Sequence, residues 1–195
     1  VSLPKGDYIS FEQYSDHELS KTPHVLKIID GGSSIGTYIQ RGGKMSTKEI
    51  ENNFSNSKFL IEELIEGVEI TVPILDAKAL PVIEIIPPQD GEFDYENKYN
   101  GQTEELCPPQ NVSLGLQKEA QALAEEVHKV MGCRHLSRVD MMIDASGNLY
   151  ILEINTMPGM TDQSLYPKSA LEAGISMPEL MKKFVDMVTR DYSLN

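Results

Sequence analysis

Four polar side chains that could bind a metal ion and an anion fall on two predicted strands joined by the short link Ala-Ser-Gly. Such a link is typical of a β-hairpin. A loop of two or of four residues would give the strands one uninterrupted register, which sets Asp140 opposite Glu153. The same register sets Arg138 opposite Asn155. Because directly opposed residues of an antiparallel pair point to one face, the spacing predicts two carboxylates, an amide and a guanidinium in a single patch.

This patch has the chemistry of a divalent-cation site. Carboxylate and amide oxygens are hard ligands of the kind that Mg²⁺ and Mn²⁺ prefer. Magnesium held by one or two carboxylates usually completes its shell with water and nucleotide phosphates. The residues therefore predict a site for a metal ion and a phosphate group. The alternative is a solvated hairpin face on which the charges neutralise one another.

A loop rich in glycine and serine, 30–36, follows a short apolar strand that contains Lys27. Its backbone amides, together with the hydroxyls of Ser33 and Ser34, could cradle phosphate oxygens. The loop has neither the P-loop pattern nor GxGxxG, so a surface turn is the alternative. Lys27 is the more informative residue, because a lysine within an apolar strand needs an anionic partner.

Two further segments contain side chains suited to a nucleotide. Residues 87–112 are predicted to form a long polar and aromatic loop, and loops of this length in a compact chain are usually functional or mobile. Within it, Lys98 and Tyr99 could belong to a lid that closes over charged ligands, or to a polar surface loop. In residues 61–69, acids alternate with apolar side chains. Such a segment could offer backbone groups to an adenine and a carboxylate to a ribose, although a half-buried strand has the same pattern.

The elements that must position these residues alternate between strands and helices. Apolar runs predict strands at 24–29, 59–65, 69–75, 79–86, 138–144 and 148–155. Capping boxes and helical spacing predict helices at 46–54, 116–131 and 176–188. Tight turns between neighbouring strands favour an α+β fold with antiparallel hairpins over a regular βαβ ladder. A soft boundary near Glu66 divides the chain into two predicted domains, 1–66 and 67–195.

Composition excludes several classes of protein. The chain has 195 residues, of which 40% are hydrophobic, so a sizeable core can form. Its net charge is −13, from 17 basic and 30 acidic side chains, which argues against a nucleic-acid partner. There is no apolar run of about 18 residues and no signal peptide, so the expectation is a cytoplasmic protein without a membrane partner. Cys107 and Cys133 lack CxxC spacing and are expected to be reduced thiols, and the four histidines show no metal-ligand spacing.

Taken in order, these segments resemble the D-alanine–D-alanine ligase family of the ATP-grasp superfamily, from about His24 to Val185. The most specific stretches are RVDMMID, LEINTMPGMT followed by SL at 164–165, and FDYENKY followed by CP at 107–108. LIEELIEGVEITVPIL is similar too. The resemblance implies an ATP-grasp fold, in which two α+β subdomains with antiparallel sheets grip the nucleotide between them.

The resemblance also implies roles for individual residues. The ATP-binding set is Lys27, Ser33, Ser34, Glu62, Glu63, Ile65, Glu69 and Lys98. Two Mg²⁺ ions, with Mn²⁺ as a substitute, would be held by Asp140, Glu153 and Asn155. The catalytic set is Arg138, Gly159, Ser33 and Tyr99, and in it Arg138 and the Gly159 N–H stabilise the oxyanion of the tetrahedral intermediate. The substrate set is Arg138 and Gly159 with Ser164 and Leu165, which bind the carboxylate of the second substrate.

The implied reaction makes D-alanyl-D-alanine for peptidoglycan precursor synthesis in two steps. ATP phosphorylates the carboxylate of one D-alanine, and the amine of a second D-alanine then attacks the acyl phosphate. Tyr99 fits relatives that make a peptide, so D-alanine is expected as the second substrate in preference to D-lactate. Two alternatives stay open: another ATP-grasp carboxylate–amine ligase, and a non-catalytic nucleotide-binding module.

Two departures from the family pattern affect these expectations. Ile28 stands where a proline usually follows the strand lysine, and this is expected to alter packing more than chemistry. The family's N-terminal substrate domain has no counterpart in the chain, which begins with Val1. The chain is therefore expected to be a fragment that is inactive alone. Its expected partners are ATP and D-alanine, the missing N-terminal domain, and a second copy of the full-length protein.

Overall fold

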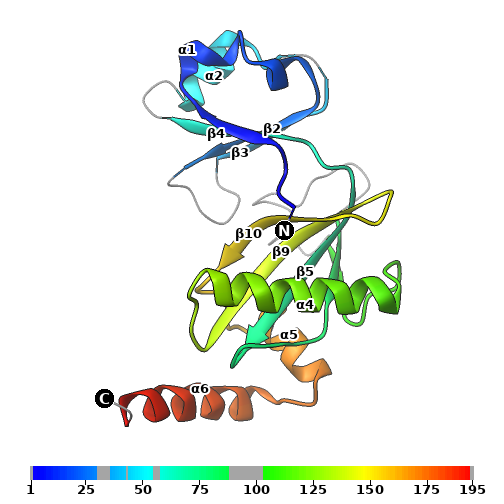
Figure 1. Ribbon diagram of the computed structural model, residues 1–195, viewed down its shortest axis with the longest axis vertical. Coiled ribbons are helices and arrows are strands. Elements are labelled where there is room, and N and C mark those ends of the chain that lie inside the picture. Colours follow the sequence, from blue (N-terminus) through cyan, green and yellow to red (C-terminus); the bar gives the residue numbers. More distant parts are fainter. Residues whose placement is uncertain (1, 30–35, 43, 55–57, 88–102, 194–195) are drawn as a thin grey trace. The chain divides into compact units, whose positions relative to one another are not determined.

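The computed structural model describes residues 2–29, 36–42, 44–54, 58–87 and 103–193. Contacts divide the chain into two compact units, each built round its own sheet (Figure 1). Of the described residues, the N-terminal unit comprises 3–65 with Pro87 and Thr103, and the C-terminal unit comprises Ser2, Glu66–Ile86 and 104–193. The chain thus changes unit beside Glu66, and the predicted division into two domains stays a prediction.

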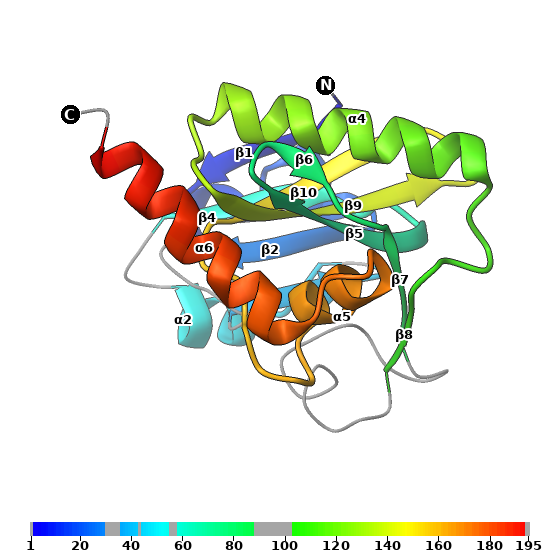
Figure 2. The same ribbon diagram turned by 90° about the horizontal axis from the view of Figure 1, so that it is seen from below.

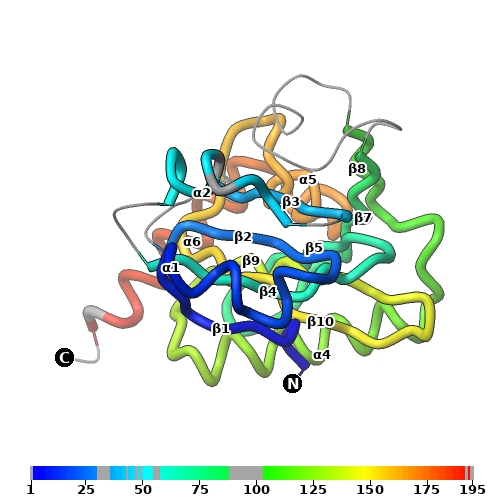
Figure 3. Tube along the Cα trace, turned by 90° about the horizontal axis from the view of Figure 1, so that it is seen from above, coloured from blue at the N-terminus to red at the C-terminus, as the bar shows by residue number. Residues whose placement is uncertain are grey.

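The N-terminal unit is an antiparallel sheet packed against short helices. In spatial order its strands are β1 (Gly6–Ile9), β4 (Phe59–Glu63), β2 (His24–Ile28) and β3 (Thr37–Gln40), and Figure 3 shows β2 running between β3 and β4. Its helical segments are α1 (Phe11–Tyr14), the 3₁₀ turn η1 (Glu18–Lys21) and α2 (Thr47–Phe54). Ile50 and Phe54 of α2 are buried against Leu26 and Phe59 of the sheet. The predicted strands 24–29 and 59–65 and the predicted helix 46–54 are confirmed, whereas β1, β3, α1 and η1 were not predicted.

A buried hydrogen-bonded pair, Tyr14 and His24, ties α1 to β2. The ring Nδ1 of His24 lies 2.7 Å from the carbonyl oxygen of Thr22, so this nitrogen carries the proton and donates. The Nε2 atom therefore accepts from the Tyr14 hydroxyl at 2.9 Å, and the same hydroxyl accepts from the Met45 N–H at 3.0 Å. His24 is thus a structural residue, as its lack of ligand spacing predicts.

The C-terminal unit contains a larger antiparallel sheet. In spatial order its strands are β10 (Leu149–Asn155), β9 (Leu136–Asp144), β5 (Gly67–Leu75), β7 (Ile83–Ile86) and β8 (Glu104–Leu106), while β6 (Lys78–Ala79) pairs with β5. Pro73 falls between the part of β5 that pairs with β7 and the part that pairs with β6. A proline is tolerated there because its missing N–H is not needed for pairing.

Three helices pack on this sheet: α4 (Leu114–Val130), α5 (Leu165–Glu172) and α6 (Met177–Tyr192). Figure 2 shows α4 along one side of the sheet, with α5 and α6 on the side away from α4. The helix predicted at 116–131 is confirmed as α4, which is followed by Gly132 at φ +65°. The capping box predicted at Ser176 and Glu179 opens α6, and α5 was not predicted. The predicted α+β class with antiparallel sheets is therefore confirmed.

The β9–β10 hairpin has a different turn from the one that the sequence predicts. Asp144 and Asn148 pair, so three residues form the loop, and the middle of the turn is closed by the Gly147 N–H on the Asp144 carbonyl oxygen at 2.9 Å. Gly147 has φ +84°, a conformation that favours glycine. The Asp144 carboxylate accepts from the Ser146 and Asn148 N–H groups at 2.8 and 2.9 Å. An odd loop shifts the register by one residue, so the predicted single register is wrong beside the turn.

A β-bulge at Leu152 corrects that shift farther along the hairpin. Beside the turn, Ile151 pairs with Met141, but beyond the bulge Glu153 pairs with Asp140 and Asn155 pairs with Arg138. The two opposed pairs that the spacing predicts are therefore confirmed, although the register that led to them is interrupted. The extra residue lets Ile151 enter the core while Glu153 shares the face of Asp140.

The sequence predicts reduced cysteines and no membrane-spanning segment. Cys107 and Cys133 are both free thiols, as predicted. No helix among the described residues is long and apolar enough to cross a membrane.

Candidate functional site

The β9–β10 hairpin presents a polar face and an apolar face. Val139 and Met141 are buried in the core against α4. Arg138 and Asp140 alternate with them and lie on the other face, where they are 9% and 6% exposed. Because opposed residues share a face, Glu153 and Asn155 lie on that side too. The structure thus brings the four predicted residues together, and we call them the carboxylate patch: Arg138, Asp140, Glu153 and Asn155.

The Asp140 carboxylate accepts hydrogen bonds from two neighbouring residues. The Arg138 guanidinium donates from Nε to Asp140 Oδ1 at 2.8 Å and from Nη2 to Asp140 Oδ2 at 2.7 Å. The Thr71 hydroxyl, on β5, donates to the same Oδ1 atom at 2.5 Å. This paired, charge-assisted geometry fixes the plane of the carboxylate.

The charge of Arg138 is stabilised by the acids around it. Burial alone would lower the pKa of Arg138, but the hydrogen bonds from Arg138 to Asp140 oppose that effect. The negative charges of Asp140, Glu153 and Glu69 act in the same direction, so the pKa of Arg138 lies above its ordinary value. The charges of three carboxylates therefore act on one guanidinium, and this excess of negative charge suits a divalent cation.

The carboxylate patch fits a hard metal ion by its donor types. Glu153 is exposed on β10, and the Asn155 side-chain oxygen accepts from the Met157 N–H at 2.9 Å, which orients the amide. Within the described ranges, no group of three His, Cys, Asp or Glu side chains could hold a metal ion. A site here would therefore be built from two carboxylates, one amide oxygen and ligands from outside the protein, as Mg²⁺ commonly accepts.

The predicted substrate residues converge after β10. A Cβ atom added to Gly159 would lie 2.8 Å from Ser164 Oγ, so only glycine fits there without moving that hydroxyl. Ser164 is the N-cap of α5, and its Oγ accepts from the Thr161 N–H at 3.1 Å. Leu165, the first residue of α5, is buried. Gly159, Ser164 and Leu165 are thus neighbours at the N-terminal end of α5.

In the N-terminal unit, Lys27 and Glu62 form an ion pair. Lys27 Nζ lies 2.5 Å from Glu62 Oε2, and both side chains are largely shielded from water. The anionic partner that a lysine in an apolar strand requires is therefore Glu62, on the neighbouring strand β4. Two residues of the predicted ATP-binding set are in direct contact.

The other described members of the ATP-binding set are divided between the two units. Glu63 ends β4, where its carboxylate accepts from the Lys5 N–H at 2.9 Å, and Ile65 follows it half-buried. Glu69 lies on β5 in the C-terminal unit, opposite Met142. The remaining predicted residues lie outside the described residues: Ser33, Ser34, Lys98 and Tyr99.

Two buried polar residues were not singled out from the sequence. Thr71 is 2% exposed and contacts Asp140. Glu84 on β7 is 1% exposed, and its carboxylate accepts from the Gln110 and Asn111 N–H groups, each at 2.9 Å. Thr71 and Glu84 are polar residues within the apolar runs of predicted strands. A polar residue in such a position is usually buried and hydrogen-bonded to a partner.

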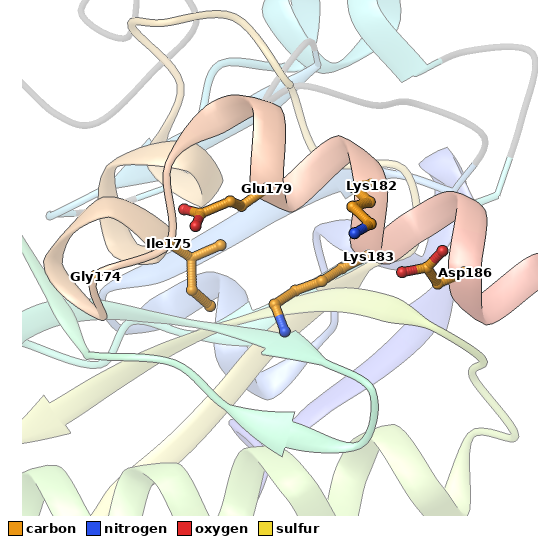
Figure 4. Close-up of a pocket in the computed structure, with 6 residues that line it drawn as sticks. All are labelled: Gly174, Ile175, Glu179, Lys182, Lys183 and Asp186. Carbon is orange, nitrogen blue, oxygen red and sulfur yellow. The ribbon is translucent and has the colours of Figure 1, made fainter.

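A pocket of about 360 Å³ beside α6 contains none of the residues predicted to bind ATP, metal or substrate (Figure 4). It is lined by Gly174, Ile175, Glu179, Lys182, Lys183 and Asp186. The four charged side chains are two acids and two lysines, all on α6, so the pocket offers no excess of either charge. It is therefore not a candidate for the phosphates of a nucleotide.

The sequence profile of the family described as "D-ala D-ala ligase C-terminus" matches residues 4–186. The D-alanine–D-alanine ligase of Clostridium beijerinckii is 42% identical over 197 residues, which cover 98% of this chain and 61% of that protein. The corresponding ligase of Mannheimia succiniciproducens is 46% identical over 173 residues, which cover 85% of this chain and 54% of that protein. The chain thus spans between half and two thirds of the length of these relatives.

Solved structures of the same kind of protein are similar in fold. The D-alanine–D-alanine ligase of Bacillus anthracis matches with a TM-score of 0.80 and 31% identity over 97% of this chain and 63% of that one. The same ligase complexed with ATP matches with a TM-score of 0.76 and 30% identity, over 97% of this chain and 62% of that one. The VanG D-Ala:D-Ser ligase of Enterococcus faecalis matches with a TM-score of 0.80 and 28% identity, over 96% of this chain and 57% of that one.

Proposed function

This chain belongs to the D-alanine–D-alanine ligase C-terminal family, and from that membership we propose that it provides the nucleotide- and metal-binding part of an ATP-dependent D-alanine–D-alanine ligase. The predicted ATP-grasp fold is confirmed by the likeness to the Bacillus anthracis ligase. The observation that supports the proposal best is the opposition of Asp140 to Glu153 and of Arg138 to Asn155 on one face of the sheet.

Asp140, Glu153 and Asn155 would hold two Mg²⁺ ions, for which Mn²⁺ could substitute. When bound, such ions neutralise charge on the phosphates of a nucleotide. The protein's own contribution is to keep the ligands in place. Asp140 is fixed by Arg138 and Thr71, and Asn155 by the Met157 N–H, so little ordering is needed when a cation arrives.

ATP would be bound by the residues that the resemblance implies. The Lys27 ammonium is suited to phosphate oxygens, and its ion pair with Glu62 balances its charge within the sheet. Glu69 would bind the ribose, and the resemblance adds further contacts to the phosphates and the base. The full proposed set is Lys27, Ser33, Ser34, Glu62, Glu63, Ile65, Glu69 and Lys98.

The reaction transfers the γ-phosphoryl group of ATP to the carboxylate of the first D-alanine, which gives ADP and an acyl phosphate. The amine of the second D-alanine then attacks the carbonyl carbon, a C–N bond forms, and the C–O bond to phosphate breaks. The always-charged Arg138 and the Gly159 N–H would stabilise the oxyanion formed in this attack. Ser164 and Leu165 would bind the carboxylate of the second D-alanine, and Ser33 and Tyr99 would complete the catalytic set.

The second substrate is proposed to be D-alanine. All the curated relatives reported above are named D-alanine–D-alanine ligases, and Tyr99 belongs to the loop pattern of relatives that make a peptide. The fold alone does not distinguish the substrates, because the D-Ala:D-Ser ligase VanG reaches the same TM-score as the Bacillus anthracis enzyme. The choice among D-alanine, D-serine and D-lactate therefore needs product analysis.

Calorimetric titration of the 195-residue chain with ATP tests the nucleotide-binding part of the proposal. Binding is expected to need Mg²⁺ and to weaken at least tenfold in Lys27→Ala, by analogy with other charged contacts to phosphate. Lys118→Ala, on the exposed side of α4, is the matched control. Mass spectrometry of the products made from D-alanine, D-serine and D-lactate by the protein in its native reading frame tests the ligation. Equal ATP affinity in Lys27→Ala, or no D-alanyl-D-alanine, contradicts the proposal.

A further inference from the structure

Thr71 connects the central strand β5 to the carboxylate patch. It pairs directly with Asp140 across the β5–β9 ladder, so both side chains leave the same face of the sheet. Thr71 is 2% exposed, and its hydroxyl donates to Asp140 Oδ1 at 2.5 Å. The hydroxyl also lies 3.4 Å from the Val139 carbonyl oxygen, which is long for an O–H···O bond. The short contact to the carboxylate is therefore the dominant one.

The fold itself does not require this hydroxyl. The neighbours of Thr71 along β5, Ile70 and Val72, are fully buried in the core on the other face. Valine has the same shape as threonine and a high preference for strands, so it would fill the position equally well for packing alone. A threonine here instead buries a polar group, which costs free energy unless that group has a partner. The partner is a carboxylate of the proposed metal site.

Arg138 cannot hold Asp140 and meet the substrate oxyanion with the same donors. Its Nε and Nη2 atoms both donate to Asp140. The guanidinium has five N–H donors, and the proposed function directs the remaining ones to the charge that develops on the substrate. The Thr71 hydroxyl, on a short and β-branched side chain of the neighbouring strand, gives Asp140 a second contact that does not depend on how Arg138 is engaged.

We propose that Thr71 is a positioning residue, whose hydroxyl fixes the orientation of the Asp140 carboxylate for a divalent cation. The inference rests on the proposed function, because it takes Asp140 as a cation ligand. It also assigns a role to a residue outside the predicted site. Residues that orient metal ligands in this way typically change metal affinity by about 10- to 100-fold when they are removed.

The test measures Mn²⁺ affinity of the 195-residue chain in the presence of ATP, by the electron paramagnetic resonance signal of free Mn²⁺. Thr71→Val replaces the hydroxyl with a methyl group of similar size and is expected to weaken Mn²⁺ binding about tenfold or more. Thr71→Ser keeps the hydroxyl and is expected to stay within about threefold of the parent, whereas a role in packing alone would be kept by valine and not by serine. Ser169→Ala is the control, because it removes a buried hydroxyl that donates to the Pro81 carbonyl oxygen.

The outcomes separate this inference from the function on which it rests. Parent-like Mn²⁺ affinity in Thr71→Val, together with a tenfold loss in Asp140→Asn, overturns the role of Thr71 and leaves the metal site standing. Parent-like affinity in Asp140→Asn, or no Mn²⁺ binding by the parent, contradicts the proposed metal site and the inference with it. Circular dichroism checks that each variant folds. If Thr71→Val does not fold, Thr71→Ala compared with Thr71→Ser measures the same contribution, with the same tenfold loss expected only for alanine.

Discussion

Glu153 lies directly opposite Asp140 because Leu152, the residue before it, is bulged out of the β9–β10 pairing. The three-residue turn gives the hairpin a register in which Ile151 pairs with Met141. Carried on without interruption, that register would turn Glu153 into the apolar core. Because of the bulge, Ile151 can pack in the core while Glu153, two residues later, lies on the opposite face in the carboxylate patch.

Deletion of Leu152 is expected to leave metal binding within about threefold of the parent, because the same pairs form without the bulge and a bulge adds mainly local twist. The measurement is the Mn²⁺ affinity of the chain in the presence of ATP. A loss of tenfold or more would show that the bulge itself aims Glu153, and would contradict the view that it only absorbs an extra residue.

In the protein in its native reading frame, Gly159→Ala is expected to raise the KM for the second D-alanine about tenfold, the cost of one hydrogen bond to a charged group. The new Cβ atom would lie 2.8 Å from Ser164 Oγ, so the hydroxyl must rotate away from the Thr161 N–H. The KM for ATP should stay unchanged. Gly115→Ala, where an added Cβ meets only Ser113 Oγ at 3.8 Å, is the control. Equal effects of both substitutions on the KM for D-alanine would refute the placement of Ser164 at the substrate.

Glu84→Gln is expected to lower the free energy of unfolding by about 1–3 kcal/mol, because an amide cannot accept all the hydrogen bonds that the carboxylate accepts. Its Oε2 atom accepts from two backbone N–H groups, while Oε1 accepts from Asn111 Nδ2 at 2.7 Å. Urea unfolding measures the change. Glu119→Gln, on the exposed side of α4, is the control and should change stability by less than about 0.5 kcal/mol. An equally small change in Glu84→Gln would mean that the hydrogen bonds of the Glu84 carboxylate do not contribute to the free energy of unfolding.

His128 is expected to make stability depend on pH. Burial lowers the pKa of His128, which is 3% exposed and lies 2.7 Å from Ser137 Oγ through Nδ1. In the unfolded chain His128 binds a proton below a pH of about 6.5, whereas in the folded chain it binds this proton only at a lower pH. The parent should therefore lose stability relative to His128→Gln as the pH falls from about 7.5 to 5.5. Parallel urea-unfolding profiles for the two proteins across this range would rule the effect out.

The sequence allowed the patch to be predicted because its two opposed pairs follow from side-chain alternation alone. It did not allow the register beside the turn to be predicted, since the carboxylate of Asp144 and the φ of Gly147 select a three-residue loop. The strands β1 and β3 were missed because they have too few residues to show a period. The helix α5 has the same length as α2, but its N-cap Ser164 has no capping box to mark it. The partner of Lys27 was also missed, because Glu62 comes beside it only through sheet pairing.

The central claim is that the carboxylate patch binds divalent cations together with a nucleotide. Its most direct test is the number and affinity of Mn²⁺ ions bound by the chain with and without ATP. Two ions per chain are expected with ATP, and Glu153→Gln should weaken their binding at least tenfold, since it removes a charged ligand. The control Glu126→Gln, exposed on α4, should bind as the parent does. ATP-independent binding, or equal affinities in Glu153→Gln and Glu126→Gln, would contradict the claim.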